Sequence, residues 1–269
     1  LKIDYDGKRC MAGDKTIIEG DAITIDGSTG NVYSGNVPTI EPKITDDFKT
    51  ILSWAQSTKK LGIRANADTP DAAKLAREYG AQGIGLCRTE RMFNGRDRIG
   101  LFVDMIMAET IEKRKQVLEK LGQLQKSDFI EILKAMEGYP VTIRLLDPPL
   151  HEFLPNPEEL ANKVRKLEEQ NATDELRRTK TILERARDLA EINPMMGHRG
   201  VRVGITYPEI YEMQIRAVFE ASAELTKQKV DARPQIMIPQ VSSIAELNQI
   251  KRIYNKIKLE MQEKHKIKF

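Results

Sequence analysis

The feature that most constrains the fold is an alternation of short apolar runs with longer helical stretches, which starts near residue 61. The runs predicted as strands are 61–66, 83–88, 141–146, 200–205 and 235–239. Strands that recur between helices indicate βαβ units on a parallel sheet. Five such units predict an α/β fold of the incomplete TIM-type (β/α)8 barrel class, because a closed barrel needs about three more strands.

The helices between these strands are predicted from apolar spacing and from capping residues. Thr69 with Pro70 opens one helix, Pro208 opens another, and Ser243 caps a helix that runs nearly to the C-terminus. The remaining helical stretches are predicted at about 97–122, 128–137 and 157–192.

Residues 1–37 show a different pattern, with many turn residues between short apolar stretches. Residues 22–26 and 31–34 predict a hairpin, and the stretch is too short for a core of its own. A linker begins at Pro38, and Thr45 is the expected N-cap of a linker helix. The predicted division is 1–37, the C-terminal part of an upstream domain; 38–60, linker and linker helix; and 61–269, the N-terminal part of the barrel.

Composition excludes several classes of function. A net charge of +3 is small beside 43 basic and 40 acidic side chains, so a nucleic-acid partner is not indicated. No apolar run approaches the roughly 20 residues of a membrane helix, and no signal peptide is recognisable. The two cysteines, Cys10 and Cys87, have no metal or redox spacing. We expect a cytoplasmic protein without a membrane or nucleic-acid partner.

Two arginines close predicted strands. Arg88 ends the run 83–88, and Arg144 lies near the end of 141–146. A guanidinium is always charged and offers a rigid fork of donors to phosphate or carboxylate oxygens. Two of them on neighbouring strands predict an anion clamp. The alternative is an ion pair at a strand end, for instance with Glu90 or Asp147.

Four motifs occur in a fixed order: Arg88-Thr89-Glu90, then 145–155, 193–200 and 236–239. Together they resemble the pyruvate, phosphate dikinase family of phosphoenolpyruvate-utilising enzymes, and residues 19–35 resemble the end of that family's swivelling phosphohistidine domain. The resemblance implies interconversion of ATP, phosphate and pyruvate with AMP, diphosphate and phosphoenolpyruvate through a phosphohistidine. It also implies that Arg88 and Arg144 hold the phosphoryl group of phosphoenolpyruvate.

The resemblance places the other catalytic parts outside residues 1–269. These are the Mg²⁺ ligands, a proton-donor cysteine, the carrier histidine and the nucleotide-binding domain. No residue of the chain is therefore assigned a catalytic role or a metal, and the chain alone is expected to be inactive. His151 and His198 are interpreted as structural. Asp147 is interpreted first as a turn residue, with a supporting role near the anion as the alternative. The full-length protein is expected to be a homodimer that binds phosphoenolpyruvate or pyruvate and its own phosphohistidine domain.

Other assignments remain open. The chain could be a shortened, non-catalytic homologue that acts as a binding or regulatory module. Within the superfamily, phosphoenolpyruvate synthase and enzyme I of the sugar phosphotransferase system are alternatives, but both lack the proline-rich stretch that begins at Asp147. Arg91, where the family commonly has histidine, and Gln240, where leucine is expected, are small departures from the pattern.

Overall fold

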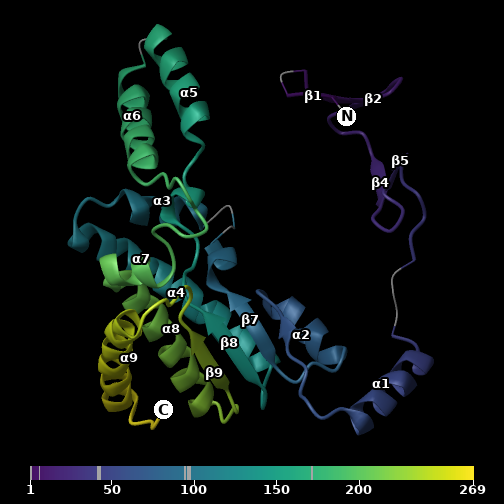
Figure 1. The fold of residues 1–269 in the computed structure, drawn as a ribbon, viewed down its shortest axis with the longest axis vertical. Helices are drawn as coiled ribbons and strands as arrows, with labels where there is room; N and C mark the ends of the chain where they lie inside the picture. Colours follow the sequence, from purple (N-terminus) through teal and green to yellow (C-terminus); the bar gives the residue numbers. More distant parts are fainter. Residues whose placement is uncertain (1, 6, 41–43, 94, 96–97, 171) are drawn as a thin grey trace. The chain divides into compact units, whose positions relative to one another are not determined.

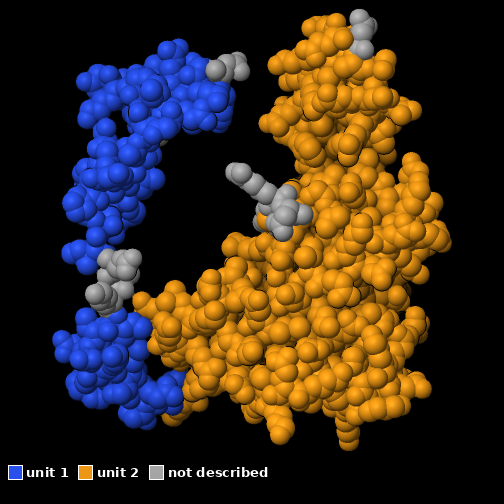
Figure 2. Space-filling model, turned by 180° about the vertical axis from the view of Figure 1, so that it is seen from behind, with its two compact units in different colours: residues 1–59 blue, residues 60–269 orange. Residues whose placement is uncertain are grey.

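The computed structural model describes residues 2–5, 7–40, 44–93, 95, 98–170 and 172–269. The chain divides into two compact units, Leu1–Lys59 and Lys60–Phe269, which Figure 2 distinguishes by colour. Each unit is described by itself. Residues 41–43, part of the predicted linker, lie outside the described residues. In the described ranges, no helix combines the length and the apolar character that crossing a membrane requires.

The first unit consists of small antiparallel sheets and one helix. Its elements are β1 (Lys2–Asp4), β2 (Arg9–Ala12), β3 (Lys15–Ile18), β4 (Ile23–Asp26), β5 (Asn31–Ser34) and α1 (Asp46–Thr58). The predicted hairpin is confirmed, since β4 pairs with β5 from Ile23–Ser34 to Asp26–Asn31. Thr45 caps α1 as expected. None of the described side chains in this unit is buried.

The second unit is built on a parallel sheet with the strand order β6-β7-β8-β9. The strands are β6 (Ala65–Asn66), β7 (Ile84–Arg88), β8 (Pro140–Arg144) and β9 (Arg233–Met237). The helices are α2 (Pro70–Glu78), α3 (Ile99–Met107), α4 (Ile111–Ala135), α5 (Pro157–Glu169), α6 (Thr173–Asp188), α7 (Val201–Thr206), α8 (Pro208–Lys227) and α9 (Ile244–His265), with single 3₁₀ turns η1 (Thr89–Phe93) and η2 (Leu150–Phe153). An α/β unit with a parallel sheet is thus confirmed.

The predicted strand 200–205 is wrong, because these residues form helix α7. The described sheet therefore has four strands instead of five. Val201 and Val203 are both fully buried, and a short apolar run that is buried on all sides does not show whether it is strand or helix. Gly200 explains the outcome: at φ 57° and ψ −130° it turns the chain just before the helix, a conformation that only glycine adopts readily.

The helix boundaries differ from prediction in three places. The stretch predicted as 97–122 breaks after α3, and Thr110 caps α4 by accepting a hydrogen bond from the Lys113 backbone N–H. Ser127, the residue before the helix predicted at 128–137, lies inside α4 because Phe129, Ile132 and the apolar residues before it continue one buried face. The stretch 157–192 divides into α5 and α6, which form a helical hairpin that projects from the sheet (Figure 1).

One of the two apolar core clusters packs on one face of the sheet. Val141 and Ile143 of β8 are fully buried in a cluster with Phe129 of α4 and Leu225 of α8. Because successive side chains of a strand point to opposite faces, Arg144 lies on the other face. The apolar side chains of β8 therefore pack against the helices, and Arg144 lies on the face away from them.

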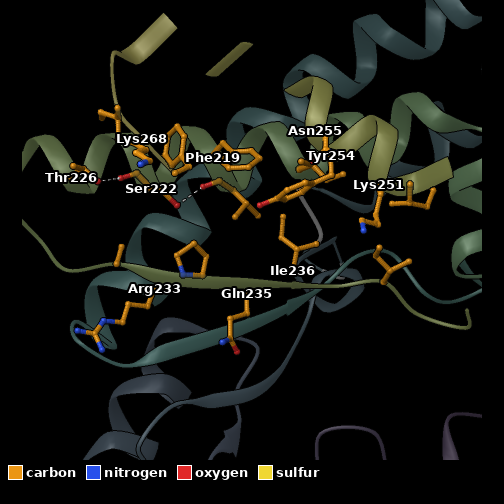
Figure 3. A pocket seen from close by; sticks show the side chains of 18 residues that line it. Phe219, Ser222, Thr226, Arg233, Gln235, Ile236, Lys251, Tyr254, Asn255 and Lys268 are labelled. Carbon is orange, nitrogen blue, oxygen red and sulfur yellow. Dashed lines mark hydrogen bonds between the residues drawn. The ribbon is translucent and has the colours of Figure 1, made fainter. Parts of the chain in front are cut away.

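Strand β9 pairs only with β8 among the described strands, and a pocket of about 600 Å³ lies beside it. Residues of α8, β9, α9 and the C-terminal segment line this pocket. In Figure 3, Ile236 lies on the same side of β9 as Phe219 and Tyr254, whereas Gln235 lies on the opposite side. The pocket is mainly apolar, and neither Arg88 nor Arg144 lines it.

Candidate anion-binding site

Arg88 and Arg144 are direct neighbours across the sheet. In the parallel register of β7 and β8, the Cα of Arg88 pairs with that of Arg144, which in turn pairs with Met237 of β9. Neighbouring strands lie about 4.8 Å apart, and paired side chains leave the same face. The expectation that the two arginines end neighbouring strands is confirmed. Both lie at the carboxyl edge of the sheet.

Asp68, in the loop between β6 and α2, fixes Arg88. One carboxylate oxygen, Oδ2, lies 2.7 Å from Nη2 and 3.0 Å from Nε of Arg88. The other, Oδ1, accepts the backbone N–H of Arg88 at 2.8 Å. These hydrogen bonds raise the pKa of Arg88 above its already high usual value. Arg91 is the second cation beside Asp68, at 3.4 Å. The guanidinium of Arg88 is thus oriented but keeps a side-chain exposure of 27%.

Arg144 is held by two carboxylates. Its Nη2 donates to Glu90, and its Nη1 lies 3.0 Å from Asp147 Oδ2. The same oxygen of Asp147 accepts from Arg199 Nη2 at 2.5 Å. The strand-end ion pairs considered as an alternative to a clamp therefore do form. Buried carboxylates on either side hold the Arg144 fork in one orientation, which is compatible with a binding role.

Four buried polar atoms in this cluster have no hydrogen-bond partner among the described residues. They are Glu90 Oε2, Arg144 Nε, Asp147 Oδ1 and Arg199 Nε. Buried polar groups in proteins are nearly always satisfied by protein, water or ligand. The cluster combines four arginines with three carboxylates, so it retains a net positive charge, and its unpaired atoms are two guanidinium donors and two carboxylate acceptors. The net charge and the two donors favour an anion.

The contact between Asp147 and Arg199 also closes a long excursion of the chain. Besides the ion pair, the backbone N–H of Gly200 donates to the Asp147 carbonyl at 2.9 Å. We call these two contacts the Asp147 clasp. The α5–α6 hairpin lies between its two ends, which are 52 residues apart. Asp147 was interpreted as a turn residue, and the structure adds that it bridges Arg144 and Arg199.

Sequence reasoning missed Asp68 and Arg199. Asp68 had one signal, namely an acid two residues after a predicted strand and directly before the cap Thr69. Arg199 stands in the motif 193–200, next to a histidine that is the more familiar functional residue. His198 itself lies in a local network, since its backbone N–H donates to Glu191 and its Nε2 lies 3.0 Å from Thr206 Oγ1.

Within the described ranges, no group of three or more His, Cys, Asp or Glu side chains is close enough to hold a metal ion. The carboxylates nearest the arginines, Asp68, Glu90 and Asp147, are each engaged by a guanidinium. Cys87 lies next to the cluster, but burial raises the pKa of its thiol to about 12, so it remains protonated at neutral pH.

Comparison with known proteins now adds to this geometry. The family described as "PEP-utilising enzyme, PEP-binding domain" matches residues 43–268. The chain is 50% identical to pyruvate, phosphate dikinase of Entamoeba histolytica, with all of this chain and 30% of the relative covered. It is 47% identical to the Giardia intestinalis enzyme, covering 98% of this chain and 29% of that one. It is 49% identical to the chloroplastic pyruvate, phosphate dikinase 1 of Arabidopsis thaliana, covering 92% of this chain and 25% of that one.

These relatives show which family the chain belongs to and how much of a full-length member it covers. The chain spans between 25% and 30% of the length of the three. The match to the family model covers most of the chain and includes the whole parallel sheet and the arginine cluster. The chain belongs to the PEP-utilising enzyme family, and most of its length corresponds to that family's PEP-binding domain.

Proposed function

We propose that the chain provides the phosphoryl-binding wall of the phosphoenolpyruvate site of a pyruvate, phosphate dikinase. The full enzyme would interconvert ATP, phosphate and pyruvate with AMP, diphosphate and phosphoenolpyruvate through a phosphohistidine. The observation that carries the proposal is the pairing of Arg88 with Arg144 at the carboxyl edge of the sheet. In barrel enzymes this edge is where active sites lie.

The two guanidinium groups suit phosphoryl transfer. This reaction leaves little covalent work to the protein, so positioning and charge stabilisation dominate. Asp68, Glu90 and Asp147 occupy part of each guanidinium and hold it in place. The outer donors of Arg88, with 27% side-chain exposure, and of Arg144, with 19%, would bind the phosphoryl oxygens. Because the guanidinium groups are already oriented, less reorganisation is needed at the moment of reaction.

The finer features of the fold belong to the same proposal. We infer that the four parallel strands are part of a (β/α)8 barrel, that 1–37 ends a swivelling phosphohistidine domain, and that 38–60 links the two. The unpaired edge of β9 and the apolar pocket beside it support a further strand at that position. The same edge and pocket argue against the alternative that the chain is a self-sufficient binding module. On this reading the Mg²⁺ ligands and the carrier histidine belong to other parts of a cytoplasmic, homodimeric enzyme, and the chain alone does not turn over.

The test is Arg144→Ala in the full-length enzyme, with each half-reaction measured separately. Loss of one oriented donor to a developing charge lowers the rate by about 10²–10³-fold. We therefore expect phosphorylation of the carrier histidine by phosphoenolpyruvate to fall by that factor, while its phosphorylation by ATP stays within twofold. Arg216→Ala is the matched control, because Arg216 also pairs with a carboxylate, Glu260, but lies on α8 outside the cluster. Unchanged use of phosphoenolpyruvate in Arg144→Ala would reject the proposal.

A further inference from the structure

One buried amide links the ends of the two arginine-bearing strands. Gln214 of α8 is only 1% exposed. Its Oε1 accepts the backbone N–H of Leu146 at 2.8 Å, and its Nε2 donates to Thr89 Oγ1 at 3.0 Å. Thr89 directly follows Arg88, and Leu146 lies two residues after Arg144. The side chain of Gln214 thus contacts both segments at once.

This link begins where the sheet ladder ends. The register of β7 with β8 ends at the pair Arg88–Arg144 among the described residues. Beyond that pair the two segments separate into η1 and the loop after β8. A side chain that bonds to both segments there limits how far they can move apart.

The surroundings of Gln214 make the link rigid. A second bond from its Nε2 reaches Gln125 Oε1 of α4 at 3.3 Å. One turn earlier on α8, the hydroxyl of Tyr211 donates to the Leu146 carbonyl at 2.9 Å. Tyr211 is fully buried, and burial raises its pKa well above the usual value, so the hydroxyl stays a donor. Two side chains of one helix therefore hold both the N–H and the C=O of Leu146.

We propose that Gln214 is a positioning residue for phosphoenolpyruvate, which sets the spacing of Arg88 and Arg144 without touching the substrate. The inference rests on the proposed function of these arginines. A displacement of about 1 Å in a positioned group can lower a rate by about 10²-fold. Replacing Gln214 should therefore act on the phosphoenolpyruvate half-reaction alone, although the residue lies in the core behind the site.

The experiment uses Gln214→Leu in the full-length enzyme. We expect kcat/KM for phosphoenolpyruvate to fall by about 10–100-fold, while histidine phosphorylation by ATP stays within twofold. Hydrogen exchange of the Leu146 amide should become faster, which shows that the intended bond is lost. Ser222→Ala is the control on the same helix, since among the described residues its buried hydroxyl bonds only to the Val218 carbonyl one turn earlier. It should leave both half-reactions unchanged.

Two results would overturn the inference. One is faster exchange at Leu146 with unchanged use of phosphoenolpyruvate; the other is a parallel fall of both half-reactions. If Gln214→Leu does not fold, Gln214→Asn decides by the same criteria, because it keeps the amide but withdraws it by one methylene. Failure of the proposed function is distinguishable: Arg144→Ala would then leave phosphoenolpyruvate use intact, whereas failure of this inference alone leaves the Arg144→Ala effect in place.

Discussion

The buried ion pair between Arg114 of α4 and Glu209 of α8 gives the sharpest stability prediction. Arg114 Nη1 lies 2.5 Å from Glu209 Oε1, and Nη2 donates to the Ala108 carbonyl at 2.9 Å. Its guanidinium also lies 4.6 Å from the centre of the Tyr207 ring. The two charged side chains are only 9% and 7% exposed. Because α8 carries Gln214, this pair also anchors the helix behind the anion site.

The perturbation is Arg114→Met, which keeps most of the apolar stem and removes the charge. Removing one partner of a buried pair leaves the other charge uncompensated and costs about 3–5 kcal/mol. For a unit of this size, each kcal/mol lowers Tm by about 2–4 °C, so we expect a drop of about 10 °C. Thermal unfolding followed by circular dichroism, with urea unfolding for the free energy, measures both quantities.

The double variant Arg114→Met with Glu209→Gln tests the cause. Since it leaves no buried charge, it should recover a large part of the stability lost in either single variant. A surface pair, Lys49 with Asp46 of α1, is the control, because exposed pairs contribute about 0–1 kcal/mol. The reasoning is refuted if Arg114→Met costs less than about 1 kcal/mol, as for a surface pair, or if the two single effects simply add.

Two further predictions concern a glycine and a cysteine. In Gly200→Ala, the new Cβ would lie 2.8 Å from Gln240 Cβ at a backbone φ of +57°, so the unfolding free energy in urea should fall by about 3 kcal/mol. Gly100→Ala, at an exposed position of helix α3 where nothing lies within 4 Å of the new Cβ, should instead gain about 0.5–1 kcal/mol; equal effects would contradict this account. Burial raises the pKa of Cys87 to about 12, so in Cys10→Ser at pH 8 iodoacetamide should leave the folded chain unmodified and alkylate one thiol in urea. The corresponding stability is present below the unfolded pKa near 9 and is lost as pH rises toward 12. Rapid alkylation of the folded variant would reject the buried thiol.

Much of the architecture follows from local signals in the sequence. Thr69, Thr110 and Ser243 each cap a helix through their own hydroxyl, and such signals span only a few residues. The placement of Arg88 and Arg144 was predictable because an apolar run that ends in a charge marks the end of a strand. Thr69 and Ser243 are predicted as caps from the sequence, whereas Thr110 is not.

Tertiary contacts decide the features that could not be predicted. Residues 200–205 alternate like a strand, but the space between the loops after β8 and β9 admits a short helix, and Gly204 lets the Tyr211 ring pack on it. The partners of the two arginines are equally non-local: Asp68 precedes Arg88 by 20 residues and Arg199 follows Asp147 by 52. No local pattern indicates that these segments meet.

The Asp147 clasp has a consequence for how the chain can vary in length. Because the clasp joins the two ends of the excursion, these ends stay together whatever the length of the chain between α5 and α6. The entropy of closing a flexible loop changes by only about 0.6 kcal/mol for each doubling of its length. Because Leu160, Val164, Leu183 and Ala186 of the hairpin are buried in the main apolar cluster, this tolerance applies to the connection between α5 and α6. That connection can be lengthened at small thermodynamic cost, while Arg144 and Arg199 keep their contacts with Asp147.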